Sequence, residues 1–279
     1  MTTPEQYVQE KAVASGSSFY YAFLFLEPPR RAAITAFYAF CREVDDVADD
    51  VSDPGVAAAK LAWWRSEVGA AFAGNPSHPA MRALLPHVAA YSIEPAHLLA
   101  VIEGCQMDLD QSRYLDFAGL ARYCDLVAGV VGEVAANIFG RTLESTVAYA
   151  HRLGLAMQLT NIIRDVGDDA RRGRIYLPMA ELKQFDVKAA ELLERKYSDR
   201  FTALMRFQAE RAHRSYDEAL ALLGEADRAA QKPGLMMANI YRSLLREIEA
   251  GGFQVLHQRI SLTPLRKLWI ACRTQWRGR

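Results

Sequence analysis

The sequence predicts an all-α protein that folds as a single domain. Three observations predict this class: the composition, the spacing of the apolar residues, and the places where proline and glycine interrupt that spacing. The chain has only 17 glycines and 11 prolines among 279 residues, while alanine, leucine, glutamate and arginine are abundant. This composition favours helices and argues against collagen-like, disordered or turn-rich β structure.

Long apolar stripes with helical spacing support the same class. Within residues 30–51 and again within residues 155–166, apolar side chains recur at intervals of three and four, which places them on one face of a helix. The first stripe consists of Ile34, Phe37, Cys41, Val44, Ala48 and Val51, and the second of Leu155, Leu159, Ile162 and Val166. Each stripe predicts a helix with one buried face.

Short strings that contain proline or glycine separate the predicted helices. None is long or of low complexity, so they favour turns and helix starts over domain linkers. They are Glu27-Pro28-Pro29, Ser52-Asp53-Pro54-Gly55, Gly74-Asn75-Pro76, Glu94-Pro95, Lys232-Pro233-Gly234 and Gly251-Gly252. We therefore expect about ten helices in one domain over residues 1–279, with residues 260–279 as a basic, aromatic C-terminal tail.

Charge and cysteine content exclude several classes of protein. The chain has 33 basic and 33 acidic side chains, and this zero net charge argues against a general nucleic-acid binder. The longest uninterrupted apolar run, Phe19 to Leu26, is far shorter than the roughly 20 residues that cross a bilayer. The N-terminus does not resemble a secretory signal. The four cysteines show no paired spacing, which is typical of reduced thiols, so we expect a cytoplasmic protein.

The C-terminal tail departs from the overall charge balance. From Arg259 onward the chain has six basic residues and no acidic one, and Trp269 and Trp276 lie among them. Such a segment can bind peripherally to the anionic inner face of the cytoplasmic membrane. A solvated helix end explains the same pattern, so both interpretations stay open.

Two short acidic windows carry the strongest functional signal. They hold seven of the 16 aspartates: Asp45, Asp46, Asp49, Asp50, Asp165, Asp168 and Asp169. Residues four apart project side by side from a helix, so each window forms part of a polar row beside an apolar stripe. The first row is Tyr38, Arg42, Asp45 and Asp49, and the second is Gln158, Asn161, Asp165 and Asp169.

Paired carboxylates on one helix face repel each other, so a nearby cation would stabilise them. Neither window contains a lysine. Mg²⁺ binds a few carboxylates together with water and substrate phosphates, so two facing acidic rows would leave room for a phosphorylated ligand. A single acidic window is usually a solvated helix face, but two windows with the same spacing favour a metal–phosphate site.

Aromatic residues crowd the region before and within the first window. Most such rings pack in a core, but beside a metal–diphosphate site they would also hold a long hydrocarbon and tolerate a carbocation. These rings are Phe19, Tyr20, Tyr21, Phe23, Phe25, Phe37, Tyr38 and Phe40. An isoprenoid diphosphate requires both features. Mg²⁺ and arginine would neutralise its departing diphosphate, and no nucleophilic side chain is needed.

A di-iron helical protein is the alternative from metal chemistry. Its pattern is a pair of Glu-x-x-His strings, and the chain contains Glu94-x-x-His97 and Glu210-x-x-His213. Glu94 precedes Pro95, which predicts a helix start and not the middle of a bundle. This alternative is therefore much weaker than the prenyl diphosphate interpretation.

Longer strings around the acidic windows resemble the squalene and phytoene synthases, the head-to-head isoprenyl diphosphate synthases. The resemblance covers nearly the whole chain and implies a helical isoprenoid synthase bundle with a central active-site cavity. The matching strings are Tyr38-Ala39-Phe40-Cys41-Arg42-Glu43-Val44-Asp45-Asp46-Val47-Ala48-Asp49, Tyr123-Cys124, Val127-Ala128-Gly129-Val130-Val131-Gly132-Glu133, Gln158-Leu159-Thr160-Asn161-Ile162-Ile163-Arg164-Asp165-Val166-Gly167-Asp168-Asp169 and Arg174-Ile175-Tyr176-Leu177-Pro178.

The resemblance implies roles for individual residues. Asp45, Asp49, Asn161, Asp165 and Asp169 match ligands of several Mg²⁺ ions that bridge the substrate diphosphates. Substrate contacts are implied for Ser18, Phe19, Arg42, Gln158, Asn161, Arg174 and Arg259. Catalytic roles around the phosphates or the reacting carbons are implied for Tyr38, Arg42, Tyr123 and Tyr241.

Within the family, residues 15–23 and 260–269 look most like the bacterial presqualene diphosphate synthases of hopanoid biosynthesis. This likeness implies that two farnesyl diphosphates condense to presqualene diphosphate with release of diphosphate. No NADPH is then expected, and partner enzymes would convert the product to squalene. Three alternatives stay open: a phytoene or dehydrosqualene synthase, a complete NADPH-dependent squalene synthase, and a non-catalytic helical protein.

Overall fold

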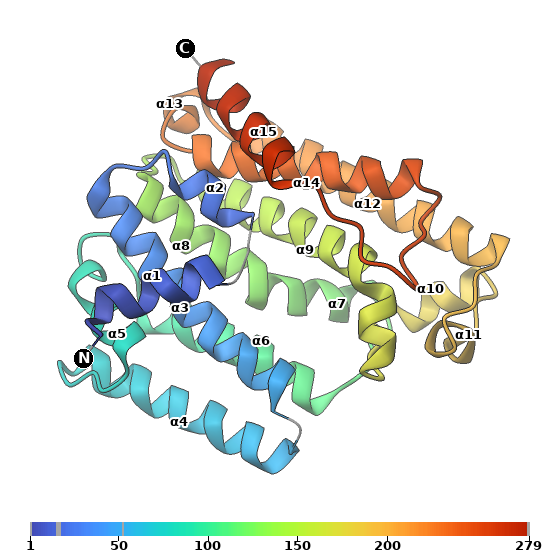
Figure 1. Cartoon of the computed structure of the whole chain (residues 1–279), viewed down its shortest axis with the longest axis horizontal. Coiled ribbons are helices and arrows are strands. Elements are labelled where there is room, and N and C mark those ends of the chain that lie inside the picture. The colour runs from blue at the N-terminus through green and yellow to red at the C-terminus, as the bar shows by residue number, and fades with distance from the viewer. Residues whose placement is uncertain (1, 15–17, 52, 278–279) are drawn as a thin grey trace.

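The computed structural model describes residues 2–14, 18–51 and 53–277, and within them the protein is all-α (Figure 1). No strand occurs in these ranges, and a single isolated bridge joins Arg113 and Ile175. The helices are α1 (Pro4–Ala14), α2 (Phe19–Phe23), α3 (Pro28–Asp50), α4 (Pro54–Phe72), α5 (Pro79–Leu84), η1 (Leu85–His87), α6 (Pro95–Asp110), α7 (Phe117–Cys124), η2 (Asp125–Gly129), α8 (Val130–Phe139), α9 (Ser145–Arg171), α10 (Met179–Gln184), α11 (Ala189–Leu193), α12 (Asp199–Leu222), α13 (Glu225–Arg228), α14 (Lys232–Ala250) and α15 (Pro264–Arg277).

The predicted all-α class is confirmed, but the expected number of about ten helices is too small. The difference arises from elements of three to eight residues, such as α10, α11 and α13. Such a short helix spans two turns or fewer and cannot show a repeating apolar stripe.

Proline sets the start of several helices, as the sequence predicts. Pro28, Pro54 and Pro95 each occupy the first turn of α3, α4 and α6, where the missing N–H would have no partner in the helix. The side chain of Asp53 caps α4 by accepting a hydrogen bond from the Val56 amide at 2.9 Å. Four members of the predicted α3 stripe are buried: Ile34, Phe37, Val44 and Ala48. The helix ends at Asp50, one residue before Val51, the expected last member of the stripe.

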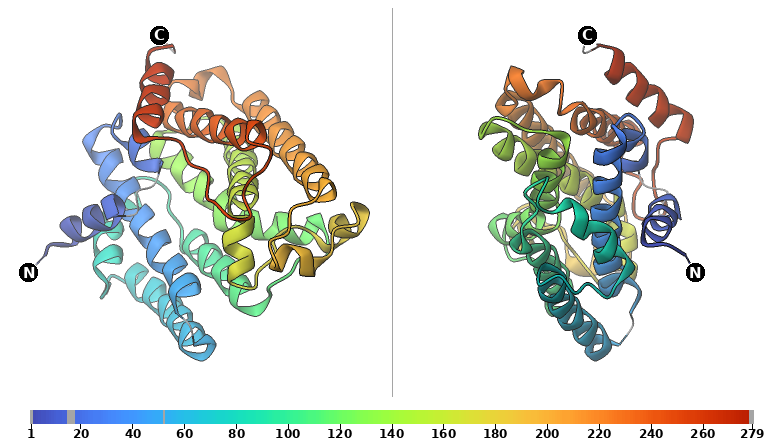
Figure 2. Two further views of the ribbon diagram at one scale, coloured as in Figure 1. Left: turned by 45° about the vertical axis from the view of Figure 1, so that its right-hand side comes forward. Right: turned by 90° about the vertical axis from the view of Figure 1, so that its left-hand side faces the viewer.

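Helices α3 and α9 organise the two halves of the bundle (Figures 1 and 2). Helix α3 contacts α1, α5 and α6, whereas α9 contacts α12 and α14, and α8 contacts both α3 and α9. One continuous core of buried apolar side chains runs through both halves. Because α3 and α9 carry the two acidic rows, this arrangement places the rows on either side of the interior.

The C-terminal region forms a helix over residues 264–277. Helix α15 packs on α14 and also touches α2, although α2 lies more than 240 residues earlier in the chain (Figure 2). Gly278 and Arg279 lie outside the described residues. Before α15 the chain crosses α9 so closely that a side chain at Gly167 would overlap the Leu256 carbonyl oxygen. None of the described helices combines the length and the apolar character that a membrane span needs.

Candidate active site

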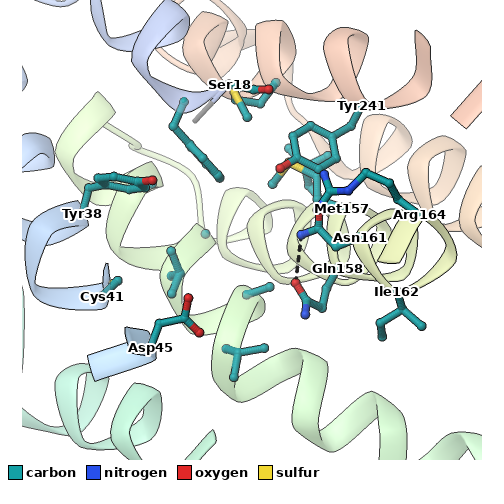
Figure 3. A pocket seen from close by; sticks show the side chains of 18 of the residues that line it. Ser18, Tyr38, Cys41, Asp45, Met157, Gln158, Asn161, Ile162, Arg164 and Tyr241 are labelled. Atoms are coloured by element: carbon teal, nitrogen blue, oxygen red, sulfur yellow. Dashed lines mark hydrogen bonds between the residues drawn. The ribbon is translucent and has the colours of Figure 1, made fainter. Parts of the chain in front are cut away.

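A cavity of about 740 Å³ lies between α3, α6, α8, α9 and α14, and every site residue predicted from the sequence lines it. Figure 3 shows part of this lining, including Tyr38, Asp45 and Asn161. Its volume is in the range of small-molecule sites. The predicted residues around it are Ser18, Phe19, Tyr38, Arg42, Asp45, Asp49, Tyr123, Gln158, Asn161, Asp165, Asp169, Arg174, Tyr241 and Arg259. The structure thus brings the whole predicted set together, and the role of each residue remains a proposal.

Arginines engage the acidic row of α3. Arg42 forms ion pairs with Asp45 and, at 2.6 Å, with Asp46. Asp49 accepts hydrogen bonds from Arg172 at 2.8 Å and from Arg174 at 3.0 Å, and both of these arginines follow the acidic window of α9. The contacts of Asp49 with Arg172 and Arg174 therefore join the α3 row to the segment that follows α9.

The row of α9 contains an oxygen atom without a partner. The Asn161 amide nitrogen donates to Gln158 Oε1 at 3.1 Å, whereas Asn161 Oδ1 is buried and accepts no hydrogen bond among the described residues (Figure 3). A buried amide oxygen normally has a donor or a cation nearby. Its position beside Asp165 therefore favours a ligand that the protein itself does not supply.

Asp165 and Asp169 lie one turn apart but in different environments. Burial alone would raise the pKa of Asp165, but hydrogen bonds from Arg164 at 2.8 Å and Arg259 at 2.9 Å outweigh it, so the net shift is downward. No described side chain forms an ion pair with Asp169. Burial, followed by repulsion from Asp165, raises the pKa of Asp169 to about 8.

The acidic rows lie toward the carboxyl ends of their helices, which adds to the need for a cation. The backbone dipole leaves partial negative charge at a helix C-terminus, so carboxylates there are disfavoured. Asp45 lies in the last two turns of α3, and burial together with the nearby Asp49 raises its pKa to about 6 even though Arg42 pairs with it. Cations placed between the rows would relieve these costs.

The donor set suits Mg²⁺ bound together with a substrate, and not a closed protein cage. Among residues 2–14, 18–51 and 53–277, no three His, Cys, Asp or Glu side chains lie close enough to hold a metal ion between them. Mg²⁺ commonly takes one or two carboxylates and completes its shell with water and phosphate oxygens. The free Asn161 oxygen and the unpaired Asp169 carboxylate fit that kind of coordination.

Three cationic side chains, Arg164, Arg259 and Lys267, meet beside the row of α9. Lys267 comes from α15 and was not identified from the sequence as a site residue. Burial and then repulsion from Arg164 and Arg259 lower the pKa of its ammonium group. The accumulated positive charge favours an anion with several oxygens, such as a diphosphate.

Asp108 is a second site residue that the sequence analysis missed. It lines the cavity from α6 and accepts hydrogen bonds from the hydroxyls of Tyr123 at 2.9 Å and Tyr176 at 2.7 Å. Burial raises its pKa, although both hydrogen bonds oppose that shift. The sequence contains only a weak signal for Asp108. Val101 and Cys105 belong to an apolar helical stripe, and Asp108 occupies the next position of that stripe, where an apolar residue would be expected.

The aromatic run divides between the cavity and other surroundings. Phe19, Phe23, Phe37 and Tyr38 line the cavity, and Phe19 and Tyr38 are in contact, with ring centroids 5.9 Å apart. By contrast, Phe40 packs against Trp64, away from the cavity. Part of the aromatic run therefore lines the cavity and part packs elsewhere, as the sequence predicted.

The two Glu-x-x-His strings do not meet. Glu94 lies immediately before α6, as expected, and its amide donates to His97 Nδ1 at 3.0 Å. His213 on α12 instead contacts Glu249 at 2.8 Å. Neither string lines the cavity, so the geometry gives the di-iron interpretation no support.

The fold and the cavity define an all-α isoprenoid synthase, and comparison with known proteins identifies the family. The squalene/phytoene synthase family matches residues 12–266. Phytoene synthase 1 of Arabidopsis thaliana is 36% identical over 257 residues, which is 90% of this chain and 61% of the plant protein. A 15-cis-phytoene synthase of Synechococcus elongatus is 36% identical over 265 residues, covering 90% of this chain and 85% of that protein.

Solved structures agree with the sequence matches. A dehydrosqualene synthase crystallised with a ligand superposes with a TM-score of 0.83 at 28% identity, and 98% of each chain is covered. The squalene synthase HpnC of Alicyclobacillus acidocaldarius gives a TM-score of 0.75 at 28% identity, with 84% of this chain and 89% of that chain covered. The chain belongs to the squalene/phytoene synthase family. It spans about three fifths of the length of the plant relative.

Proposed function

We propose that the protein joins two farnesyl diphosphates head to head to form presqualene diphosphate, with release of one diphosphate and one proton. The observation that carries this proposal is the shape of the cavity. Acidic and basic side chains gather at one end, from Asp45 and Asp49 to Asp165 and Asp169, and apolar side chains line the rest. A long hydrocarbon that carries a diphosphate matches both parts.

The residues of the chain bind and orient the charged end of the substrate. Arg164, Arg259 and Lys267 offer hydrogen-bond donors to diphosphate oxygens, and Arg42 and Arg174 lie on the opposite side. As negative charge develops on the departing diphosphate, these donors stabilise it without reorganisation, because ion pairs already hold most of them. The substrate carbon left behind becomes an allylic cation.

The acidic rows would hold Mg²⁺ through Asp45, Asp49, Asn161, Asp165 and Asp169. When bound, Mg²⁺ supplies positive charge that weakens the bond between carbon and the leaving diphosphate. Phe19, Phe23 and Tyr38 line the cavity, where they would exclude water and where their aromatic rings would tolerate a cation.

Ring closure in this product releases a proton from the second farnesyl chain. Burial raises the pKa of both Tyr123 and Tyr241, so these phenols stay neutral at physiological pH and are poor bases. Neutral tyrosines can still donate hydrogen bonds to phosphate oxygens. We therefore assign proton uptake to the released diphosphate.

Three other products are candidates for the same kind of site. Both sequence relatives carry the name phytoene synthase, which favours a longer prenyl substrate, and the solved relatives include a dehydrosqualene synthase. A complete NADPH-dependent squalene synthase is the third candidate. If presqualene diphosphate is the final product, separate enzymes must reduce it to squalene.

Product analysis tests the proposal. The purified protein is incubated with Mg²⁺ and farnesyl diphosphate or geranylgeranyl diphosphate, each with and without NADPH, and the lipids are identified by mass spectrometry. We expect presqualene diphosphate from farnesyl diphosphate in both NADPH conditions, and no product when EDTA is present. Phytoene as the dominant product, or squalene that appears only with NADPH, would replace the proposed reaction with one of the alternatives.

We also propose that α15 binds the surface of an anionic bilayer. Leu265, Trp269 and Trp276 are 79%, 59% and 74% exposed, and Arg273 lies over the Trp269 ring. Exposed tryptophans beside basic residues suit the interface between water and lipid. If α15 were only a solvated helix end, the protein would bind neither kind of vesicle in the test that follows.

Vesicle sedimentation tests the bilayer contact. We expect binding to vesicles that contain phosphatidylglycerol, little binding to pure phosphatidylcholine, and release by 0.5 M NaCl, because salt screens the charge attraction. The double substitution W269A/W276A should weaken binding, whereas W63A, at another exposed tryptophan on α4, should not. Equal loss with W63A would contradict the assignment to α15.

A further inference from the structure

The end of the cavity away from the acidic rows is closed by the amino-terminal turns of three helices. Ile34 on α3, Tyr149 on α9, and Gly234 on α14 all line it. Phe139 at the carboxyl end of α8 completes this group, and the buried Gln231 lies beside it with its amide nitrogen bonded to the Ala136 carbonyl at 3.0 Å. We refer to Ile34, Phe139, Tyr149 and Gly234 as the apolar end of the cavity.

Helix geometry gives the distance between the apolar end and the acidic rows. Tyr149 precedes Asp165 by 16 residues on α9, which corresponds to about 24 Å along the helix axis. On α3, Ile34 precedes Asp49 by 15 residues, or about 22 Å. On both helices the residues of the apolar end therefore lie about 22 to 24 Å, measured along the helix axis, from the acidic residues.

Tyr149 is the largest side chain at the apolar end. It is 1% exposed, and its hydroxyl has no hydrogen-bond partner among the described residues. A Cβ atom placed on Gly234 would lie 2.7 Å from that hydroxyl but 3.7 Å from the ring carbon that carries it. The hydroxyl therefore lies against the backbone of α14, which prevents the Tyr149 side chain from moving away from the cavity.

We propose that Tyr149 is a specificity-determining residue, which closes the apolar end of the cavity and limits the length of the prenyl chain. The inference rests on the proposed function, because it needs a prenyl diphosphate bound with its charged end between the acidic rows. A chain one isoprene unit longer would have to displace the Tyr149 ring. The glycine at position 234 lets the hydroxyl fit against α14.

A competition assay tests the role of Tyr149. Equal amounts of farnesyl and geranylgeranyl diphosphate are supplied with Mg²⁺, and the ratio of C40 to C30 products is measured. We expect Y149A to raise this ratio by roughly tenfold or more, since a single extra methylene already changes selectivity by about 10–200-fold and an isoprene unit adds five carbons. Y149F keeps the ring and should leave the ratio unchanged.

Gly234 provides a second test, which avoids the removal of a large buried side chain that Y149A involves. In G234A the new methyl group displaces the Tyr149 hydroxyl, so we expect the use of geranylgeranyl diphosphate to fall more than the use of farnesyl diphosphate. The double substitution Y149F/G234A removes the overlapping oxygen and should restore the wild-type ratio. This rescue would not occur if Gly234 served only the stability of α14.

The outcomes separate the inference from the proposed function. A wild-type protein that turns over neither substrate would overturn both. Product formation with the same ratio in folded wild type and Y149A would overturn only the inference. If Y149A fails to fold, G234A and its Y149F/G234A partner decide: an unchanged ratio in G234A, or no rescue, would overturn the inference.

Discussion

At the scale of single residues, the site holds negative charge that the protein does not fully compensate. Asp169 shows this most clearly, because burial and repulsion from Asp165 disfavour its ionised form. Such a group destabilises the free protein and is retained where it serves a function. Asp165 lies one turn earlier but is paired with Arg164 and Arg259.

We predict that D169N loses turnover by about a hundredfold or more while it stabilises the ligand-free protein. The pKa of Asp169 is raised in the folded state, so the folded protein binds a proton that the unfolded chain releases. The amount by which Asp169 lowers the free energy of unfolding therefore grows as pH rises from about 4 to about 8. In urea unfolding without Mg²⁺, D169N should raise the free energy of unfolding above that of the wild type by more at pH 8 than at pH 5.

D165N serves as the matched comparison. It should also lose turnover, but without a gain in stability, because the substitution weakens the contacts with Arg164 and Arg259. If D169N and D165N shift the unfolding free energy equally, the two carboxylates do not differ in the way described.

Asp227 is a buried carboxylate with a structural role. It accepts hydrogen bonds from the Thr142 and Leu143 amides at 2.9 Å and from the hydroxyls of Thr142 and Thr146, which fixes the loop before α9. Burial opposes its ionised form, but these hydrogen bonds lower its pKa overall. Its stabilising contribution is thus present above the ordinary pKa of an aspartate and is lost as pH falls below it.

We predict that D227N lowers the free energy of unfolding by on the order of 3 kcal/mol at pH 7, with a smaller effect at pH 3. Asp110, on the surface of α6, provides the control, and D110N should change stability by less than about 0.5 kcal/mol. A similar small effect of both substitutions in urea unfolding would contradict the role given to Asp227.

Repeated spacing on a helix predicted the site residues that occur in groups, and the family resemblance added single residues such as Tyr123 and Tyr241, but two single residues were missed. Asp45, Asp49, Asp165 and Asp169 were detected because their spacing on a helix repeats. Asp108 and Lys267 have no such repeat, and each reaches the cavity only because its helix packs against the others. No local pattern in the sequence records that packing.

At the scale of elements, close backbone packing sets the position of the second acidic row. A Cβ atom at Gly154 on α9 would lie 2.6 Å from the carbonyl carbon of Ala128 in η2. The η2 segment is a π-helical turn, and its residues Val127 and Ala128 line the cavity. Glycine is needed here for close approach and not for an unusual backbone angle.

Two helical glycines should therefore respond in opposite directions to the same change. G154A forces α9 away from η2, and we expect a loss of about 1–3 kcal/mol in unfolding free energy. At Gly69 on α4, a Cβ meets nothing within 4 Å, so G69A should raise stability by up to about 1 kcal/mol. Thermal melts of both variants check this prediction, and a stable G154A would refute the close-packing argument.

Long helices were predictable from sequence, whereas the irregular segments between them were not. Proline positions located the starts of α3, α4 and α6. The π-helical turn of η2 follows α7 directly without a proline, and its only glycine, Gly129, marks its last residue. Its conformation depends on contacts with α9, which are distant in sequence.

At the scale of the whole molecule, the cavity lies between the half of the bundle around α3 and the half around α9, and charged side chains of the site connect the two halves. Asp49 on α3 is joined to Arg172 and Arg174, which follow the window of α9. A ligand that binds both acidic rows would strengthen this connection and raise the melting temperature by linkage.

We predict that Mg²⁺ and pyrophosphate together raise the melting temperature more than the sum of their separate effects. Each needs the other, because carboxylates repel the free anion and no described carboxylate cluster holds the metal alone. Differential scanning fluorimetry can measure the four conditions. The cooperative part should disappear in D169N, and its persistence there would argue against Asp169 as a ligand.

A crystal structure with a non-hydrolysable farnesyl thiodiphosphate and Mg²⁺ would show directly whether the acidic rows bind the diphosphate. We expect electron density for the diphosphate and metal between the α3 row and the α9 row, with the prenyl chain running along α9 toward Tyr149. Density for the diphosphate outside these rows, with Asp45, Asp49, Asp165 and Asp169 directed to bulk water, would contradict this expectation.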